Sequence, residues 1–165
     1  MNKIIIVDNH TLFCEGIKLL IENEGLGEVT AEAKNGQSFL DILKTQQPDL
    51  VIMNMDMPLM DGVETTINAL QMIPNLRILV LTMLSEMANY LDILNAGAMG
   101  IVLKTSGKTE LEKAIKIVSN GESYYSYELL KQIMVNANLK SQPTKNTILI
   151  PIDYANREKE MLEYF

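Results

Sequence analysis

The stretch from Pro48 to Gly62 constrains the fold of this chain more than any other. It begins with an unbroken apolar run, Leu50 to Met53, which ends in polar residues, a proline and the start of a helical pattern. A short apolar run without alternation is typical of a strand buried on both faces of a parallel sheet. Open sheets of this kind bind ligands just beyond the carboxyl ends of their strands. Asn54 and Asp56 stand at that position, so the sequence predicts a functional site there.

Similar short apolar runs alternate with amphipathic helical patterns over the first three quarters of the chain. The predicted strands are residues 3–7, 28–33, 50–53, 77–81 and 100–103; the predicted helices start at 11, 37, 61, 86 and 107, and a further one covers 126–139. Such alternation predicts an α/β fold with a parallel sheet, helices on both faces and right-handed crossovers. The apolar stripes expected to face the core include Leu12, Phe13, Ile17, Leu20 and Ile21 on the first helix and Val63, Ile67 and Leu70 on the third.

The composition limits the classes of function. With 165 residues and 47% hydrophobic content, the chain can form one globular domain with an appendage. Its net charge of −7 argues against this portion binding nucleic acid by itself, because phosphate binding needs a basic surface. The sequence contains no membrane-spanning run or signal-peptide pattern, and its single cysteine, Cys14, has no partner for an internal disulfide. We therefore expect a cytoplasmic protein with no membrane partner.

Polar residues terminate four of the five predicted strands. In a doubly wound sheet these ends converge on one crevice, where carboxylates and a carbonyl can hold Mg²⁺ while a hydroxyl and an ammonium hold phosphate oxygens. The residues at these ends are Asp8, Asn9, Asn54, Thr82 and Lys104.

The motifs around these residues resemble those of response-regulator receiver domains, most closely the NarL/LuxR type. Five of them occur in the right order and at the right spacing within residues 1–121. They are Val7-Asp8-Asn9-His10, Pro48-Asp49 through Asn54, Met57-Pro58-x-Met60-Asp61-Gly62, Leu81-Thr82-Met83 and Gly97-Ala98-x-Gly100-Ile101-Val102-Leu103-Lys104. The resemblance implies a flavodoxin-like (CheY-like) sheet of five strands in the order 2-1-3-4-5.

The resemblance also implies a role for each site residue. Asp8 and the residue at position 9 would bind Mg²⁺ together with the backbone carbonyl of Asp56. Position 54 would accept a phosphoryl group from a sensor histidine kinase. The switch and phosphate-contact positions would be Thr82, Ile101 and Lys104, where Thr82 moves towards the phosphoryl group, Lys104 pairs with it and an aromatic at 101 reports the switch.

This sequence departs from the receiver pattern at several of these positions. The acceptor position holds Asn54, whose neutral amide is a poor nucleophile, whereas a carboxylate can form an acyl phosphate. Asn9 replaces the second acidic residue, so the site has lost two negative charges and should bind Mg²⁺ weakly or not at all. The Asp56 carboxylate would restore one of the two lost negative charges only if its side chain pointed into the site. Position 101 is Ile101 rather than an aromatic, and Thr105 stands where many receivers have proline.

Asn54 has two explanations. It could be an engineered block at an otherwise conventional phosphorelay receiver, because Asp→Asn is the natural knock-out. The additional departures at Asn9 and Ile101 favour a naturally degenerate receiver instead. We therefore expect a non-enzymatic response regulator that controls transcription without phosphorylation, as a homodimer or through another partner or small ligand.

Enzymes on similar sheets are a third possibility. The Asn54-Met55-Asp56 sequence is similar to the Asp-x-Asp motif of haloacid-dehalogenase-like phosphatases, but it follows the third strand and begins with an amide. A flavodoxin-like electron carrier would need a phosphate-binding loop after the first strand, and Asp8 to Thr11 does not resemble one.

Several other residues are better explained by structure than by chemistry. We interpret His10 as a loop or helix-start residue, Cys14 as a packed thiol, and Asp49 and Asp61 as loop and helix-start residues. For dimerisation, the candidate surfaces are Tyr90 and Ile93, the helix that starts at 107, and the segment from Tyr124 to Leu139.

The C-terminal part is expected to lead into an output domain. Residues 122–150 read as a helical linker, and residues 151–165 resemble the start of a truncated LuxR-type DNA-binding domain through Arg157-Glu158-x-Glu160. We therefore expect contact with DNA only through a helix-turn-helix whose recognition helix is missing from this sequence.

Overall fold

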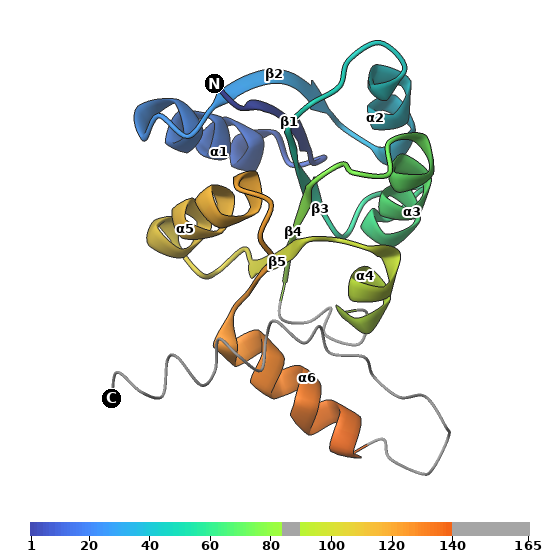
Figure 1. The fold of residues 1–165 in the computed structure, drawn as a ribbon, viewed down its shortest axis with the longest axis vertical. Coiled ribbons are helices and arrows are strands. Elements are labelled where there is room, and N and C mark those ends of the chain that lie inside the picture. Colours follow the sequence, from blue (N-terminus) through green and yellow to red (C-terminus); the bar gives the residue numbers. More distant parts are fainter. Residues whose placement is uncertain (84–89, 140–165) are drawn as a thin grey trace. The chain divides into compact units, whose positions relative to one another are not determined.

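The computed structural model describes residues 1–83 and 90–139 of the chain (Figure 1). Residues Met1–Met134 form one compact unit; of the second unit, Val135–Phe165, only the last turn of a helix is described. The strands are β1 (Lys3–Val7), β2 (Glu28–Ala33), β3 (Leu50–Asn54), β4 (Ile78–Thr82), β5 (Gly100–Leu103) and β6 (Tyr124–Tyr125). The helices are α1 (Thr11–Asn23), α2 (Gly36–Leu43), α3 (Gly62–Met72), α4 (Tyr90–Ala96), α5 (Lys108–Ser119) and α6 (Tyr127–Leu139).

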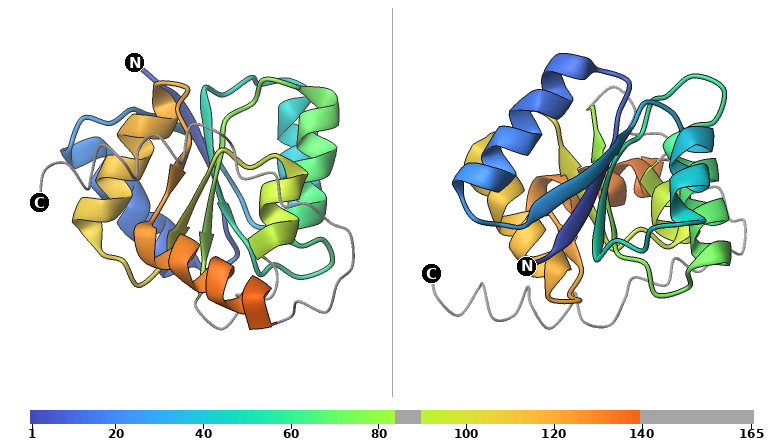
Figure 2. Two further views of the ribbon diagram at one scale, coloured as in Figure 1. Left: turned by 60° about the horizontal axis from the view of Figure 1, so that its bottom comes forward. Right: turned by 90° about the horizontal axis from the view of Figure 1, so that it is seen from above.

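The strands form one parallel sheet in the order β2-β1-β3-β4-β5-β6. Helices α1 and α5 cover one face, and α2, α3 and α4 cover the other (Figure 1 and Figure 2). The predicted α/β fold and the order of the first five strands are confirmed. The sheet has one more strand than predicted, because the two-residue β6 is too short to give a periodic signal.

Successive side chains of the central strands point to opposite faces of the sheet and so belong to two separate cores, as expected for strands covered on both sides. On the α1 and α5 face, Ile4, Ile6, Leu50, Ile52, Leu79, Leu81 and Val102 pack with Cys14, Ile17 and Ile115. On the other face, Ile5, Val7, Val51, Met53, Ile78, Val80 and Ile101 pack with Phe39, Ala69 and Ile93. All four residues of the Leu50–Met53 run are buried, which explains why this run shows no alternation.

The predicted inward face of α3 is confirmed for Val63 and Leu70, which are partly buried and pack against the core, but not for Ile67. Ile67 is 42% exposed, whereas Thr65 and Thr66 are fully buried. Threonine is tolerated there because each hydroxyl has a partner: Thr65 Oγ1 donates to the carbonyl oxygen of Asp61 at 2.7 Å, and Thr66 Oγ1 to Met53 Sδ at 3.6 Å. A count of apolar residues alone therefore misses the two threonines that complete the inward face of the helix.

Helix α1 follows its prediction only in part. Ile17 and Ile21 are buried as expected, but Leu12 is 82% exposed. Cys14 is fully buried on the sheet side, three residues before Ile17, and so completes the inward stripe. The interpretation of Cys14 as a packed thiol is confirmed, and burial together with the nearby Asp8 carboxylate raises the pKa of this thiol.

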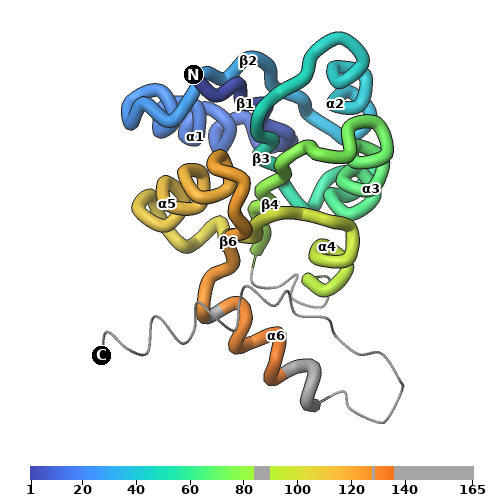
Figure 3. Tube along the Cα trace, viewed as in Figure 1, coloured from blue at the N-terminus to red at the C-terminus, as the bar shows by residue number. Residues whose placement is uncertain are grey.

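The segment after α5 packs onto the sheet edge at β5 (Figure 3). Strand β6 pairs with β5 through Gly100 with Tyr124 and Ile101 with Tyr125, and the Tyr125 hydroxyl donates to the Ala98 carbonyl oxygen at 3.0 Å. Leu129 at the start of α6 is fully buried in the core cluster on the α2, α3 and α4 face. Leu129 thus anchors the first turns of α6 to the core of the Met1–Met134 unit.

Two residues proposed for a dimer surface cannot serve there. Tyr90 and Ile93 of α4 are both 0% exposed and belong to the core. They are buried because their side of α4 faces the sheet, where the Tyr90 hydroxyl donates to the Met83 carbonyl oxygen at 3.1 Å. Residues 140–165, including the expected linker end and DNA-binding start, lie outside the described residues. No helix within the described ranges is long and apolar enough to cross a membrane.

Candidate functional site

The site lies at the carboxyl ends of β1, β3 and β5, and Asp8 is at its centre. Asp8 follows β1 directly and is 2% exposed. Its Oδ2 is 3.0 Å from Lys104 Nζ, and its Oδ1 accepts a hydrogen bond from the His10 backbone N–H at 2.8 Å. The His10 ring nitrogen Nδ1 also lies 2.9 Å from Oδ1. This buried carboxylate therefore has a cationic partner on one oxygen and hydrogen-bond partners on the other.

Asn54 ends β3 and is 3% exposed. Its amide nitrogen Nδ2 lies 2.7 Å from the Asp56 carbonyl oxygen, 3.2 Å from Asn9 Oδ1 and 3.3 Å from Asp8 Oδ1. Asp56 contributes only its backbone, since its side chain is exposed. The structure thus brings Asp8, Asn9, Asn54 and the Asp56 carbonyl together, as the sequence predicted, but it adds no second carboxylate.

The β3–α3 loop holds Asn54 in place by a close backbone approach. The Gly62 N–H donates to the Met55 carbonyl oxygen at 2.8 Å, and a Cβ at Gly62 would lie 2.8 Å from the Asn54 carbonyl oxygen. A larger residue would push the loop away from the site. Asp61 caps α3 by accepting from the Glu64 N–H at 2.9 Å, which confirms its interpretation as a helix-start residue.

Lys104 reaches the site from the end of β5. Its backbone N–H donates to the Thr82 carbonyl oxygen at 2.8 Å, and its side chain is 10% exposed. Nζ lies 4.4 Å from the centre of the Phe13 ring, so the ring face and the Asp8 carboxylate both stabilise the ammonium. The expectation that the strand ends at Asp8 and Lys104 converge on one crevice is confirmed.

The other two expected switch positions, Thr82 and Ile101, are both fully buried. Thr82 is fully buried at the end of β4, with Oγ1 3.5 Å from the Met83 carbonyl oxygen. Ile101 is fully buried within the sheet, paired with Val80 on one side and Tyr125 on the other. Position 101, where the resemblance implies an aromatic side chain, therefore holds an aliphatic residue of the core.

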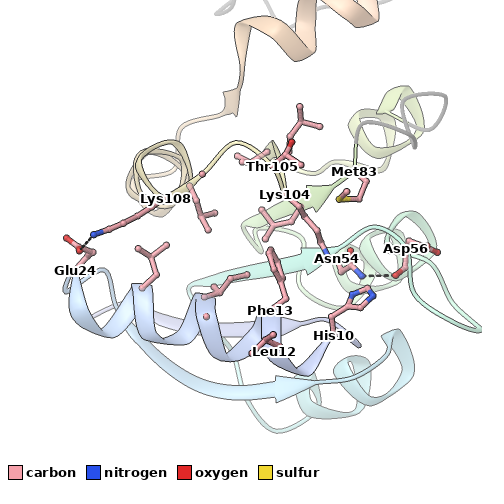
Figure 4. A pocket seen from close by; sticks show the side chains of 18 of the residues that line it. His10, Leu12, Phe13, Glu24, Asn54, Asp56, Met83, Lys104, Thr105 and Lys108 are labelled. Atoms are coloured by element: carbon pink, nitrogen blue, oxygen red, sulfur yellow. Dashed lines mark hydrogen bonds and ion pairs between the residues drawn. The ribbon is translucent and has the colours of Figure 1, made fainter.

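An open groove of about 1150 Å³ runs from this site along α1 and the start of α5 (Figure 4). Asn54, Asp56 and His10 lie at one end, and Glu24 and Lys108 lie at the other. The walls between them are mainly apolar and include Leu12, Phe13 and Leu111. The exposed Leu12 side chain therefore lines this groove rather than the core.

Sequence reasoning missed two contributors to the site, His10 and Phe13. His10 was assigned only to the loop, which is correct for its backbone because it precedes α1, but its ring also contacts Asp8. An Asp followed two residues later by a histidine at a strand end is the local signal that could have indicated this contact. Phe13 was assigned to the core stripe, and only the structure shows Lys104 over its ring.

The model of the response regulator receiver domain matches residues 4–116. The chain belongs to this family. Among curated relatives, the receiver is 28% identical to the transcriptional regulatory protein DegU of Brevibacillus brevis over 172 residues, covering 98% of this chain and 73% of DegU. It is 32% identical to the virulence transcription regulator BvgA of Bordetella pertussis over 162 residues, covering 98% of this chain and 75% of BvgA.

Solved structures give the same assignment. A LuxR-family response regulator from Aurantimonas sp. superposes with a TM-score of 0.78 at 31% identity, covering 84% of this receiver and 99% of that chain. RcsB from Salmonella enterica bound to promoter DNA with the phosphomimetic BeF3⁻ gives a TM-score of 0.71 at 28% identity, covering 82% and 67%. A second RcsB structure, of two dimers bound to two parallel DNAs, gives 0.74 at 25% identity, covering 81% and 68%. The resemblance to LuxR-type receivers inferred from the motifs is confirmed.

Proposed function

We propose that this chain is the receiver part of a response regulator that controls transcription without phosphorylation at position 54. The observation that carries the proposal is the chemistry of Asn54. Its side chain occupies the acceptor position at the end of β3, and its amide nitrogen faces the Asp8 carboxylate and the Asp56 carbonyl oxygen. An amide offers no nucleophilic carboxylate oxygen and forms no acyl phosphate.

Control of transcription is supported by the relatives, since DegU and BvgA are both named as transcriptional regulators. The RcsB structures support action as a homodimer on DNA. With a net charge of −7, this receiver would leave DNA contact to a C-terminal domain and would itself act as a non-enzymatic regulatory module. A receiver is a two-state element, and dimerisation or a bound partner can bias it as phosphorylation does.

The direct test is phosphorylation by a small-molecule phosphodonor with Mg²⁺, followed by intact-protein mass spectrometry. We would compare the unaltered chain with Asn54→Asp, Asn9→Asp and the double variant. Wild type and Asn9→Asp should keep their mass, while Asn54→Asp and the double variant should gain one phosphoryl group. A phosphoryl group on the unaltered receiver that Asn54→Ala abolishes would refute the proposal.

A second measurement addresses the state of the receiver. If Asn54 holds an active state, the unaltered chain should dimerise at the same concentration as the phosphorylated double variant in analytical ultracentrifugation. Dimerisation only after phosphorylation of the double variant would instead favour the alternative, a conventional phosphorelay receiver blocked at position 54.

A further inference from the structure

The Asn54 amide nitrogen lies at the point where a receiver would hold its cation. The resemblance assigns the metal to Asp8, residue 9 and the Asp56 carbonyl, and these three groups are the ones within 3.3 Å of Asn54 Nδ2. They come from the end of β1, the loop after it and the loop after β3. One amide group therefore bridges the segments that a cation would bridge.

The orientation of this amide follows from its neighbours. The Asp8 carboxylate and the Asp56 carbonyl oxygen are acceptors, so only the nitrogen end of the Asn54 amide can satisfy them. Placing the amide oxygen there would set it against two further oxygens inside a buried site. The N–H groups thus point into the space where a metal would need to bind.

The residues present do not fit a Mg²⁺ site. Magnesium is held by hard oxygen ligands, usually with carboxylates. Here one carboxylate faces the site, that of Asp8, and Lys104 already neutralises it at 3.0 Å. The Asp56 side chain is exposed, and Asn9 and Asn54 are neutral. The described part of the chain has no cluster of three or more His, Cys, Asp or Glu residues that could bind a metal.

We infer that the Asn54 amide performs the structural role that a cation would have in this site, so that the site of this receiver is complete without metal. The amide joins β1 to the β3–α3 loop, and Lys104 supplies the positive charge. Aspartate at position 54 would undo both features. It would remove the N–H donors to the Asp56 carbonyl and place a second carboxylate about 3 Å from the Asp8 carboxylate, where the two like charges would repel each other. The inference concerns metal dependence and stability, and it holds or fails independently of phosphorylation.

The test is thermal unfolding of the whole chain in chelator and in millimolar MgCl2, without phosphodonor. The unaltered receiver should have the same Tm in both conditions. Asn54→Asp should unfold roughly 5 °C lower in chelator and regain most of that loss in Mg²⁺. Asn54→Ala, which lacks both the amide and the carboxylate, should be destabilised equally in both.

A matched control is Asn35→Asp, the same substitution at the N-cap of α2, where Oδ1 accepts from the Ser38 N–H at 2.8 Å. Aspartate can accept that bond too, so this variant should show no Mg²⁺ response. The inference is overturned if Mg²⁺ raises the Tm of the unaltered receiver as much as that of Asn54→Asp. It is also overturned if Asn54→Asp is as stable as the unaltered chain in chelator. Should Asn54→Asp fail to fold in chelator, a Mg²⁺ titration of the unaltered chain by calorimetry decides the point, because any saturable binding heat that Asn54→Ala abolishes contradicts it.

Discussion

Two lysine–carboxylate pairs join the region after β5 to opposite ends of α1, and they differ in burial. Lys104 binds Asp8 just before α1, with side chains 10% and 2% exposed. Lys108 binds Glu24 at the far end of α1, with side chains 61% and 32% exposed. The chemical groups are the same, and Lys104, Lys108 and Glu24 all line the same groove (Figure 4). The two pairs therefore differ mainly in burial, and burial is expected to determine how much each pair contributes to stability.

Burial determines how much each partner depends on the other. In the buried pair, each charge has been removed from most of its water, so a charge left alone would be costly. In the exposed pair, water and salt replace a lost partner. We therefore expect only the Lys104–Asp8 pair to be required for the folded receiver.

Lys104→Met is the variant with the largest expected effect. The substitution keeps an apolar side chain over the Phe13 ring but leaves the Asp8 carboxylate buried without a counter-charge. The free energy of unfolding should fall by about 3 kcal/mol. Urea unfolding followed by circular dichroism measures it. A change close to zero would mean that the His10 and Asn54 hydrogen bonds suffice for Asp8.

Adding Asp8→Asn to Lys104→Met tests whether that loss is electrostatic. If the loss comes from the uncompensated carboxylate, the double variant should be more stable than Lys104→Met alone, with a coupling energy of about 2 kcal/mol in the complete cycle. The same urea measurements on the four proteins provide it. Additive effects would point to lost packing of the lysine stem instead.

Tyr124 provides a case of intermediate burial, and its hydroxyl lies 3.1 Å from Glu110 Oε1 on α5. Burial, followed by the Glu110 charge, raises the pKa of Tyr124 from 10 to about 12. The folded receiver therefore holds this proton more tightly than the unfolded chain. The resulting stability is complete below pH 10 and is lost as the pH rises towards 12.

The measurement is the urea midpoint of wild type and Tyr124→Phe as the pH is raised from 10. Tyr124→Phe should lack this part of the alkaline loss, so the difference between the two proteins should shrink with pH. Because Tyr124 is only half-buried, the effect should be smaller than that of Lys104→Met. Parallel curves for the two proteins would contradict the raised pKa.

The sequence was sufficient for the first five strands and for the convergence of Asp8 and Lys104 on one site, because apolar runs and their polar ends follow directly from burial on both faces of a sheet. It was insufficient where side-chain hydrogen bonds decide orientation. The buried threonines of α3 and the ring of His10 depend on partners that are distant or ambiguous in the sequence. The direction of the Asn54 amide likewise depends on which of its neighbours are acceptors, and only the folded site brings those together.

Lys108→Met is the matched control for Lys104→Met and should have the smallest effect. A hydrogen bond from Lys108, and then its charge, lowers the pKa of Glu24 below its ordinary value of 4.5. Any stability from this pair is therefore present above that value and lost as the pH falls through the lowered pKa. At neutral pH the urea midpoint of Lys108→Met should match wild type within error, and a slight deficit should disappear in acid or high salt. A loss comparable to that of Lys104→Met would show that the position of a charge pair along α1, rather than its burial, determines its contribution, because the two substitutions remove the same group.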